Sequence, residues 1–548
     1  MTLLTVLALL PLWTVHYLPL QDLPHHLMRV FVLLHAEDAR YDFSSKYAVS
    51  FFPTPYILAD YVLYLWGQFF SLQTSTKLLL SFYMVLLPWS LFYFLRSVDP
   101  EKTVLGVFSF LLLYNWQLNK GFLNQVLSLP IFFFTVGYWW RHRGRCGYQQ
   151  LALLAVLVFL TYTAHLHTFV LLALMLGALW VLADRSWRAA GETALAFVPC
   201  GLLYLWVVLT RLPTAPELHV PPALVFRDPW FHFLEAFGPA LRYFGSFSPA
   251  AETKLFAVAA SVWIVLLVAG WRQALRSPFL WLAALSGVLY LVLPEHAFGI
   301  GYLAPRTLHF APLLVLPALL LPRDVWMRTG VLLVAAALAG SQLFITHRDY
   351  RRIDRELQNF AAVFDQIPPG RKLAYWSVRG RSAVGEHAPF ALFGAYYYLK
   401  KAGEFVELDE AFTGPLRSVR LREAPRTSVS RAELAAETLA SRPVAPGGYI
   451  AVISVGEDEV VRQAAQRFGY APVAQFAGVT FFRREREVDV PWEKYFQFGA
   501  GSDFDYLVIH EDITYSQPSP PPEAVPVITY GNVHLYRRVP APEKSLPE

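Results

Sequence analysis

Residues 74–95 read TSTKLLLSFYMVLLPWSLFYFL, a stretch that contains a single charged residue and is long enough to cross a lipid bilayer. A transmembrane helix needs about twenty predominantly apolar residues. Ten further segments come close to this criterion: 1–19, 103–117, 121–140, 150–164, 167–184, 192–210, 254–271, 278–294, 307–322 and 329–346. The sequence therefore predicts an α-helical polytopic membrane protein with about eleven transmembrane helices.

The composition excludes a water-soluble globular protein. Of the 548 residues, 55% are hydrophobic and 16% are charged, against about 25% charged residues in soluble domains. The formal net charge is +5. Because no basic stripe with interleaved aromatic residues occurs, this excess indicates basic membrane-flanking loops and no nucleic-acid partner. Cys146 and Cys200 lie far apart and offer neither a disulfide framework nor a cysteine-based metal site.

The loop charges give the orientation of the predicted helices, because Lys and Arg in short loops mark the cytoplasmic side. If 74–95 runs from outside to inside, the basic loops all fall on that side: Arg96 and Lys102; Arg141, Arg143 and Arg145; Arg185 and Arg188; Arg272 and Arg276; Arg323 and Arg328. The first segment has no basic flank and no small-residue cleavage site, which indicates a retained anchor. We therefore expect a multi-pass protein of the plasma (bacterial inner) membrane with a cytoplasmic N-terminus.

Residues 53–72, PTPYILADYVLYLWGQFFSL, are long enough to cross the membrane but carry Asp60 near the middle. A carboxylate is expensive at the bilayer centre, so we expect an amphipathic helix on the outer surface. The alternative, a crossing helix, reverses the side of the N-terminus, and the loop charges alone do not decide between the two. The interfacial interpretation makes 20–73 a first outer loop with interfacial helices at about 23–36 and 53–72.

After about residue 347 the pattern changes from apolar spans to a charged and then β-rich sequence. An amphipathic helix pattern from His347 ends at a Pro-Pro-Gly break and is followed by a strand-like run. Further strand-like runs alternate with helical patterns: strands at 449–455, 479–484, 504–511 and 533–538, and helices near 388–402 and 457–468. This alternation predicts a membrane domain at 1–346 and an extracytoplasmic α/β domain at 347–548 that ends in a Pro-rich tail.

Polar residues gather at 21–29, QDLPHHLMR, where the first apolar segment ends. If a helix starts just after Asp22, this residue is the N-cap and Pro24 falls in the first turn, where its missing N–H costs little. The spacing i, i+4, i+7 then places Asp22, His26 and Arg29 on one face. In a structural interpretation, Asp22 is only a cap and the histidines are interfacial. In a functional one, an acid at the outer end of a span belongs to a site.

Other polar residues fall in the predicted outer loops. Arg306 lies in YLAPRTLHF (302–310), and its planar guanidinium suits a phosphate because it donates two parallel hydrogen bonds. Snorkelling at the membrane interface is the alternative for Arg306. His165 and His167 lie in the short turn TYTAHLHTF (161–169). We expect these residues and Asp22 to line one buried cavity in the outer leaflet, suited to an anionic lipid headgroup and a polar acceptor. Nearby outer-loop residues would belong to the same cavity: Asn115, Asn119, Lys120, Asn124, His296 and His309.

Several kinds of chemistry find no support in the sequence. His25 and His26 are adjacent and so point in different directions on a helix, and His165 and His167 lack an i, i+4 partner. We therefore predict no metal ligands among the site residues. No GxSxG, GxGxxG, P-loop or HExxH pattern and no internal repeat occurs.

This layout resembles the GT-C superfamily, the polytopic glycosyltransferases that take sugars from polyprenyl-phosphate donors. The resemblance covers residues 1–346, through short and degenerate motifs. It rests on an acidic residue that opens the first outer loop, interfacial helices in that loop, a YNW…GFLN segment, an HLH turn and a late outer-loop Arg: Asp22, about 23–36 and 53–72, 114–124, 165–167 and Arg306. The layout is similar to that of the protein-mannosyltransferase and aminoarabinose-transferase branch, whose members also carry an extracytoplasmic C-terminal domain.

The resemblance implies that Asp22 is a general base. It would deprotonate the acceptor hydroxyl as this attacks the anomeric carbon, with inversion and loss of polyprenyl phosphate, and partial desolvation would raise its pKa toward a useful value. Arg306 and Lys120 would hold the phosphate and stabilise its growing charge. The remaining predicted substrate-binding residues are His26, Arg29, His165 and His167. The implied partners are a polyprenyl-phosphate-sugar donor and a lipid, glycan or protein acceptor, and no cofactor is implied.

The chain departs from the family pattern at two places. Several branches carry paired acids where this chain has Gln21 and Asp22, and some have a second acid where Asn119 and Lys120 stand here. A dependence on a divalent metal therefore stays open.

Two other classes of function are alternatives. A non-enzymatic transporter or flippase uses intramembrane charge and often repeat symmetry, but few charged residues lie mid-span after Asp60 and no repeat occurs. A membrane-anchored assembly or binding protein would act through the C-terminal domain, so that Asp22→Asn is silent and deletion after Thr346 abolishes function. The enzyme interpretation predicts that Asp22→Asn stops turnover in a folded protein.

Overall fold

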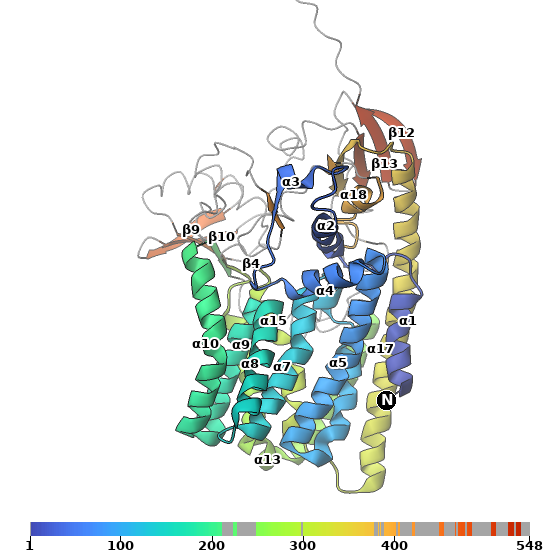
Figure 1. The fold of residues 1–548 in the computed structure, drawn as a ribbon. Coiled ribbons are helices and arrows are strands. Elements are labelled where there is room, and N and C mark those ends of the chain that lie inside the picture. Colours follow the sequence, from blue (N-terminus) through green and yellow to red (C-terminus); the bar gives the residue numbers. More distant parts are fainter. Residues whose placement is uncertain are drawn as a thin grey trace, which may run out of the picture.

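A computed structural model of the chain shows a bundle of helices with β-sheets gathered at one end (Figure 1). Within the described part, five helices are long and apolar enough to cross a membrane. They are α5 (Leu72–Val98), α9 (Leu166–Leu179) with the π-helical turn after it, α10 (Trp187–Thr210), α12 (Pro249–Ala269) and α17 (Val325–Asp365). The structure describes residues 2–210, 223–226, 248–297, 300–377, 382, 384, 388–401, 404–405, 419–421, 449–453, 466, 470–476, 479–484, 506–510, 524–530 and 533–538.

Other predicted spans form shorter or less regular helices. The short apolar helices are α1 (Thr2–Trp13), α8 (Tyr148–Ala164) and α14 (Pro278–Val292). The segment predicted at 121–140 is α7 (Leu123–His142), and the one at 103–117 is mainly a 3₁₀ helix, η1 (Pro100–Leu112). The coarse prediction of a mostly helical protein with several apolar helices of membrane-spanning length is therefore confirmed, whereas the number of eleven spans stays a prediction.

Residues 307–322 do not form one helix, so the prediction of a continuous span there is wrong. The chain instead forms α15 (Leu303–Leu308), α16 (Ala311–Leu314) and the 3₁₀ helix η4 (Leu316–Ala318). Prolines stand at 305, 312 and 317, and each lacks a backbone donor and crowds the preceding turn. Arg306 is thereby carried on the short helix α15 rather than at the end of a long one.

The segment 53–72 contains a single ten-residue helix, α4 (Leu58–Gly67). Ten helical residues rise about 15 Å, half the thickness of the hydrocarbon core, so α4 is too short to cross a membrane. It lies at the same end of the bundle as α2 (Leu23–Leu34) (Figure 1). Leu65, Phe69 and Phe70, in and just after α4, are exposed. This placement agrees with a helix that lies on the membrane surface.

The longest helix is α17, whose 41 residues correspond to about 60 Å. Its first half is an apolar span and its second half is the charged sequence that follows His347. It runs along the whole bundle beside α1 and reaches the sheet that contains β12 (Ala524–Tyr530) and β13 (Val533–Arg538) (Figure 1). The predicted domain boundary at 346/347 therefore falls inside a continuous helix.

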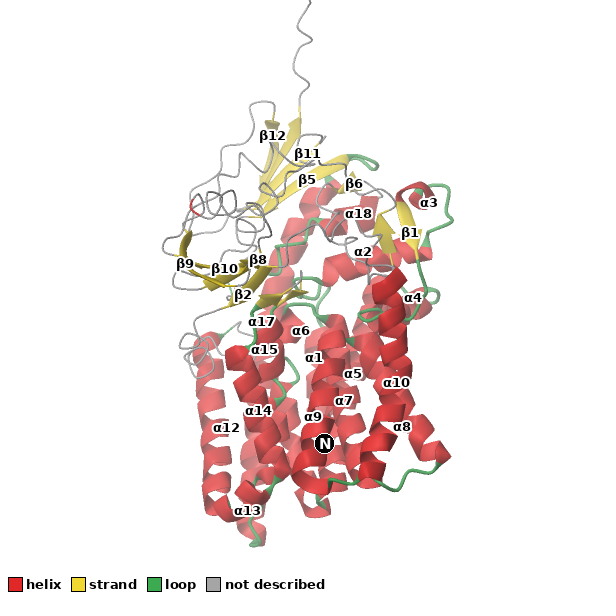
Figure 2. Ribbon diagram, turned by 90° about the vertical axis from the view of Figure 1, so that its left-hand side faces the viewer, coloured by secondary structure: helices red, strands yellow, loops and turns green. Residues whose placement is uncertain are grey.

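One sheet belongs entirely to the C-terminal part and lies above the bundle (Figure 2). Its strand order is β12-β13-β11-β5-β6, with β11 (Tyr506–His510), β5 (Lys372–Ser377) and β6 (Glu404–Phe405). Strand β5 pairs in parallel with both β11 and β6. Helix α18 (Ala395–Lys401) connects β5 to β6, as expected for a crossover between parallel strands.

A second sheet combines strands from both parts of the chain. Its order is β4-β3-β2-β8-β10-β9. Loops between bundle helices supply β2 (Ala223–Phe226), β3 (His296–Ala297) and β4 (Ile300–Gly301), and the C-terminal part supplies β8 (Tyr449–Ile453), β10 (Val479–Arg484) and β9 (Tyr470–Phe476). A two-stranded ladder likewise pairs β1 (Tyr47–Val49) with β7 (Val419–Leu421). Main-chain hydrogen bonds therefore join the C-terminal part to loops of the helical bundle.

The strand-like run predicted after the Pro-Pro-Gly break contains β5, and the four further predicted strands coincide with β8, β10, β11 and β13 to within a residue or two at their ends. Among the strands of the C-terminal part, β6, β7, β9 and β12 were not predicted, and β12 begins inside the proline-rich sequence SQPSPPPEAVP (516–526). The helical pattern near 388–402 contains α18. The pattern near 457–468 lies almost entirely outside the described residues, and so does the Pro-rich tail.

Candidate functional site

Asp22 lies at the start of α2, where its backbone is held by the loop after α6 (Trp116–Asn119). The amide of Gln21 donates to the carbonyl oxygen of Asn119, and the amide of Asp22 donates to that of Lys120, both at 3.0 Å. The half-buried Asp22 side chain makes no capping hydrogen bond to α2, although it occupies the N-cap position. The interpretation of Asp22 as only a helix cap therefore lacks the contact that defines a cap.

Gly121 permits the close approach of this loop to Asp22. Its backbone is left-handed, with φ of +79°, and a Cβ atom built on it would lie 2.7 Å from the amide nitrogen of Asp22 and 2.9 Å from that of Leu23. Glycine adopts a left-handed conformation without the penalty that other residues incur. Any side chain at position 121 would therefore displace the start of α2 as well as strain its own backbone.

Arg306 and His165 form the second part of the site. Nη1 of Arg306 lies 2.5 Å from Nε2 of His165, and both side chains are buried. A guanidinium can only donate, so Nε2 of His165 must accept and the proton of a neutral ring must sit on Nδ1. Burial and the charge of Arg306 hold the pKa of His165 well below its usual range, which is consistent with a neutral ring.

Several polar atoms around this pair are buried without a hydrogen-bond partner among the described residues. They include Nε of Arg306, Nδ1 of His165 and both ring nitrogens of His167. The ring of His167 lies 6.1 Å from that of His165, centre to centre. Each buried donor without a partner costs about 1–3 kcal/mol. The Nε–H of Arg306 is such a donor on a buried cation, and an anion would satisfy both its hydrogen bond and its charge.

Two tyrosines close to Arg306 have left-handed backbones. Tyr56 has φ of +67° and Tyr302 has φ of +59°, a conformation that is uncommon for bulky residues and costs of order 1–2 kcal/mol. The ring of Tyr56 meets His165 edge-on, with ring centres 4.7 Å apart. Strained backbone of this kind concentrates at functional sites, so the two tyrosines add weight to the Arg306 region as a site.

Charge also links Arg306 to Asp22. Burial lowers the pKa of the Arg306 guanidinium, and the nearby carboxylate of Asp22 acts in the opposite direction. A guanidinium stays protonated under these conditions, so the site holds a permanent cation opposite a carboxylate. The carbonyl oxygen of Arg306 accepts a hydrogen bond of 3.2 Å from Nε2 of Gln117 on α6, which ties α15 to the loop that also holds Asp22.

Lys120 lies among aromatic rings beside the same loop. Its Nζ donates to Oε1 of Gln21 at 2.7 Å and sits 5.4 Å from the centre of the Tyr302 ring and 5.7 Å from that of Trp116. The guanidinium of Arg306 lies 4.5 Å from the centre of the Phe122 ring. Two cations thus rest on one aromatic group, in which Trp116, Phe122 and Tyr302 touch one another.

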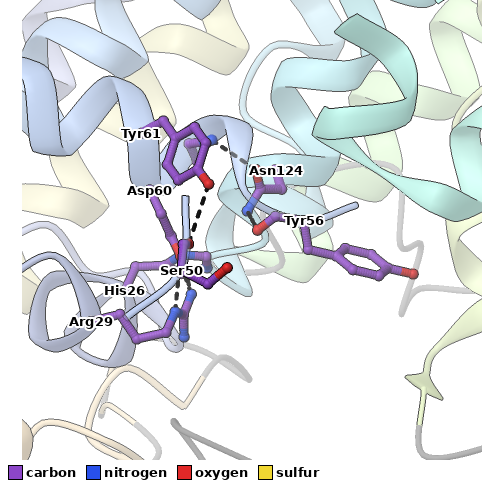
Figure 3. A network of polar contacts seen from close by, with 8 residues as sticks. His26, Arg29, Ser50, Tyr56, Asp60, Tyr61 and Asn124 are labelled. Carbon is purple, nitrogen blue, oxygen red and sulfur yellow. Dashed lines mark hydrogen bonds and ion pairs between the residues drawn. The ribbon is translucent and has the colours of Figure 1, made fainter. Parts of the chain in front are cut away.

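His26 and Arg29 meet an acid on a different helix, Asp60 of α4 (Figure 3). Nδ1 of His26 lies 3.1 Å from Oδ1 of Asp60, and Nε of Arg29 donates to Oδ2 at 3.1 Å. Arg29 and Asp60 are only 2% and 1% exposed. Asp60 is therefore the anion that neutralises Arg29 and joins α2 to α4. The sequence analysis had considered Asp60 only as a carboxylate that is unfavourable inside a membrane.

The Asp60 carboxylate is held ionised by its neighbours. Burial alone would raise its pKa, but the charge of Arg29 outweighs burial and lowers the pKa below the usual range. The start of α4 is fixed by Asn124, whose Oδ1 accepts from the amide of Ala59 and whose Nδ2 donates to the carbonyl oxygen of Tyr56, both at 2.8 Å (Figure 3). Asn124 thus connects α4 to α7 and to the backbone of the strained Tyr56.

The structure brings five of the predicted residues into one region, and it places His26 and Arg29 in the neighbouring ion pair with Asp60. The five are Asp22, Lys120, His165, His167 and Arg306. Sequence reasoning did not assign site roles to Asp60, Tyr56, Phe122, Gln117, Gly121 and Tyr302. Asp60 could have been recognised as an acid in an otherwise apolar helix. Gly121 could have been recognised from the Lys-Gly pair before α7, which is typical of a turn. The positive φ angles of Tyr56 and Tyr302 have no signature in the sequence.

Among the residues described, no group of three or more His, Cys, Asp or Glu side chains is placed to hold a metal ion. The dependence on a divalent metal therefore stays an open question, because part of the C-terminal region falls outside the description. A comparison with models of known protein families finds no match, and no curated protein is significantly similar to the chain.

Proposed function

We propose that the chain is a membrane glycosyltransferase of the GT-C type that moves a sugar from a polyprenyl-phosphate donor to an envelope, lipid or protein acceptor. The observation that carries the proposal is the buried Arg306 guanidinium, whose Nε–H has no partner among the described residues and whose charge interacts with the carboxylate of Asp22. A phosphate monoester or diester would accept from this donor and neutralise the cation. A lipid donor also explains why an anion site lies at the end of a bundle of apolar helices.

Asp22 acts as general base in this proposal. Its carboxylate takes the proton of the acceptor hydroxyl as the oxygen attacks the anomeric carbon, the bond from that carbon to the phosphate oxygen breaks, and the configuration inverts. Arg306 stabilises the negative charge that grows on the departing polyprenyl phosphate, and Lys120 is a second cation within the same aromatic group. Positioned base catalysis contributes about 10²–10⁴-fold to a rate.

The same proposal places the site on the extracytoplasmic face of the plasma membrane. The basic loops predicted to be cytoplasmic include the residues around α13 (Trp271–Arg276) and the start of α17, which lie at the end of the bundle remote from α2, α4 and the sheets (Figure 1). By the positive-inside rule that end faces the cytoplasm, so Asp22, Arg306 and the C-terminal part face outward.

Binding of polyprenyl phosphate, the leaving group of the reaction, tests the anion site without any knowledge of the sugar. The purified protein in detergent is titrated with polyprenyl phosphate, followed by native mass spectrometry. Arg306→Gln removes the charged donors, and we expect binding to weaken about tenfold to a hundredfold, as for the loss of a charged hydrogen bond. The control Arg272→Gln removes an exposed cation at the opposite end and should leave binding unchanged. Equal affinities of wild type and Arg306→Gln would exclude the site.

A further inference from the structure

The backbone that leads into Asp22 is bound to the second half of α17, more than three hundred residues away in the sequence. The amides of His16 and Tyr17 donate to the two carboxylate oxygens of Asp354 at 2.9 and 2.7 Å. Asp354 is buried, and Oδ2 also accepts from Nε2 of Gln358 at 2.8 Å. One carboxylate on α17 thus fixes two successive peptide units between α1 and Asp22.

The loop on the other side of Asp22 is bound to the same helix. The hydroxyl of Tyr350 donates to Oδ1 of Asn119 at 2.6 Å, and both side chains are buried. Asn119 and Lys120 supply the carbonyl oxygens that accept from the amides of Gln21 and Asp22. Tyr350 and Asp354 are four residues apart and therefore share one face of α17, from which they reach the two flanks of Asp22.

Further contacts bind the same segment from other elements. Nζ of Lys77 on α5 donates to the carbonyl oxygen of Val15 at 2.7 Å. The ring of Tyr17 packs edge-on against Phe393 and Tyr396, with ring centres 5.3 and 5.1 Å apart, and Tyr396 belongs to α18 of the C-terminal part. The segment therefore lies between the bundle and the C-terminal part, and α17 is continuous between the two.

We infer that Tyr350 and Asp354 are positioning residues for Asp22: the second half of α17 sets where the carboxylate stands by fixing the backbone before and after it. The inference rests on the proposed function as far as turnover is concerned, but the restraint itself is independent of any reaction. In this arrangement the C-terminal part contributes to the site through α17 without supplying a group that touches substrate.

Hydrogen–deuterium exchange of the full-length protein tests the restraint. In Asp354→Asn the side-chain NH₂ replaces one acceptor and faces a backbone N–H, so the amides of 16–17 lose protection; in Tyr350→Phe the amides of 21–22 lose it. We expect exchange in a peptide that covers 14–23 to speed up about threefold to tenfold, as for the loss of one net hydrogen bond. Tyr350→Phe keeps the ring that packs on Tyr114, so it remains informative if Asp354→Asn folds poorly.

Matched controls are available on exposed positions. Asp365→Asn is the same change at the exposed end of α17, and Tyr148→Phe is the same change at a residue that is 96% exposed. Both should leave exchange in 14–23 and the turnover rate at their wild-type values. Unchanged exchange in Asp354→Asn and Tyr350→Phe would overturn the inference.

Turnover kinetics separate positioning from general loosening. With a polyprenyl-phosphate-sugar donor, Asp354→Asn and Tyr350→Phe should lower kcat about tenfold and leave the KM for the donor unchanged, because Arg306 and His165 are untouched. Faster exchange with an unchanged kcat, or a KM that rises as much as kcat falls, would overturn the positioning role. If the wild-type protein transfers no sugar, the proposed function fails, and exchange still decides whether α17 holds the segment.

Discussion

Gly121 and the start of α2 are in such close contact that the side chain at position 121 decides where Asp22 stands. In Gly121→Ala the new methyl group would meet the amide nitrogens of Asp22 and Leu23 at less than 3 Å, and the left-handed backbone adds about 1–2 kcal/mol of strain. We expect turnover to fall at least about tenfold while polyprenyl phosphate binding is kept, because Arg306 lies on another helix.

The control for this prediction is Gly177→Ala in α9. Gly177 has no atom within 4 Å of its built Cβ and no left-handed backbone, so alanine is tolerated there and favours a helix. Steady-state kinetics and polyprenyl phosphate titration of both variants provide the measurement. Full activity of Gly121→Ala would show that the contact between the 120–121 loop and α2 does not set the position of the acid.

At the residue scale the sequence carried part of the candidate site. The cluster of polar residues at 21–29 and the isolated Arg306 could be recognised in the sequence because they lie at the ends of apolar segments. Polar groups in such places are candidates for a functional site. The pairing of Arg29 and His26 with Asp60 was not visible, because helix periodicity relates residues of one helix and says nothing of a partner on another.

At the scale of elements, the ion pair of Arg29 and Asp60 holds α2 against α4. Removal of the acid in Asp60→Asn leaves a buried guanidinium without its counterion, which costs on the order of 3–5 kcal/mol. We expect a markedly lower thermal midpoint at pH 7. The exposed pair of Arg40 and Asp38, 2.6 Å apart, provides the matched control: Asp38→Asn should leave the midpoint almost unchanged, since exposed pairs contribute little.

The effect of Asp60→Asn should depend on pH. Because the pKa of Asp60 is lowered in the folded protein, its contribution is fully present above the ordinary carboxyl pKa of about 4 and is lost as pH falls below it. The difference in midpoint between wild type and Asp60→Asn should therefore be largest from about pH 6 to 8 and narrow below about pH 4, with Arg29 as the charged partner. A constant difference down to pH 3 would contradict the ion pair.

The local sequence predicted which segments form helices, but it did not predict how long each helix is. Long apolar runs such as 74–95 predicted α5 because burial of a whole helix surface leaves a continuous apolar signal. The break of 307–322 into short pieces follows from Pro312 and Pro317, with Pro305 just before them. These prolines are a local signal, but a prediction from hydropathy alone does not use them. The start of α4 is held by a hydrogen bond from the amide of Ala59 to Asn124 on another helix, which no local pattern contains.

At the scale of the whole molecule, the sheet that mixes bundle loops with C-terminal strands joins the two parts. Strand β2 lies between β3 and β8, so both of its edges are paired. Proline at Val225 would remove a donor from a central strand, where proline is hardly ever found. We expect Val225→Pro to make the C-terminal part more sensitive to limited proteolysis in the full-length protein.

The matched control is Val527→Pro in β12, an edge strand. Val527 is 48% exposed and lies at the irregularity in the β12–β13 pairing, next to the native Pro526. Proline is tolerated at edges and bulges, so protease sensitivity should stay at the wild-type level. Equal sensitivity of the two proline variants would contradict a shared sheet.

The composite sheet could not be predicted from the sequence. Residues 223–226 and 449–453 are each too short to specify a partner, and strand pairing across more than two hundred residues depends on the folded bundle. The prediction of separate units at 1–346 and 347–548 captured the change in composition, but the continuous α17 and the shared strands join the parts more closely than a linker would.

The most direct test of the proposed function is the turnover of Asp22→Asn. Both proteins, wild type and variant, are purified and first shown to have equal thermal midpoints and equal affinity for polyprenyl phosphate. Each is then incubated with a radiolabelled polyprenyl-phosphate sugar, with a membrane extract as the source of acceptor. We predict that the variant binds the donor but transfers sugar at least about a hundredfold more slowly, because the amide cannot accept the proton of the acceptor hydroxyl. Transfer at the wild-type rate would contradict the assignment of Asp22 as general base.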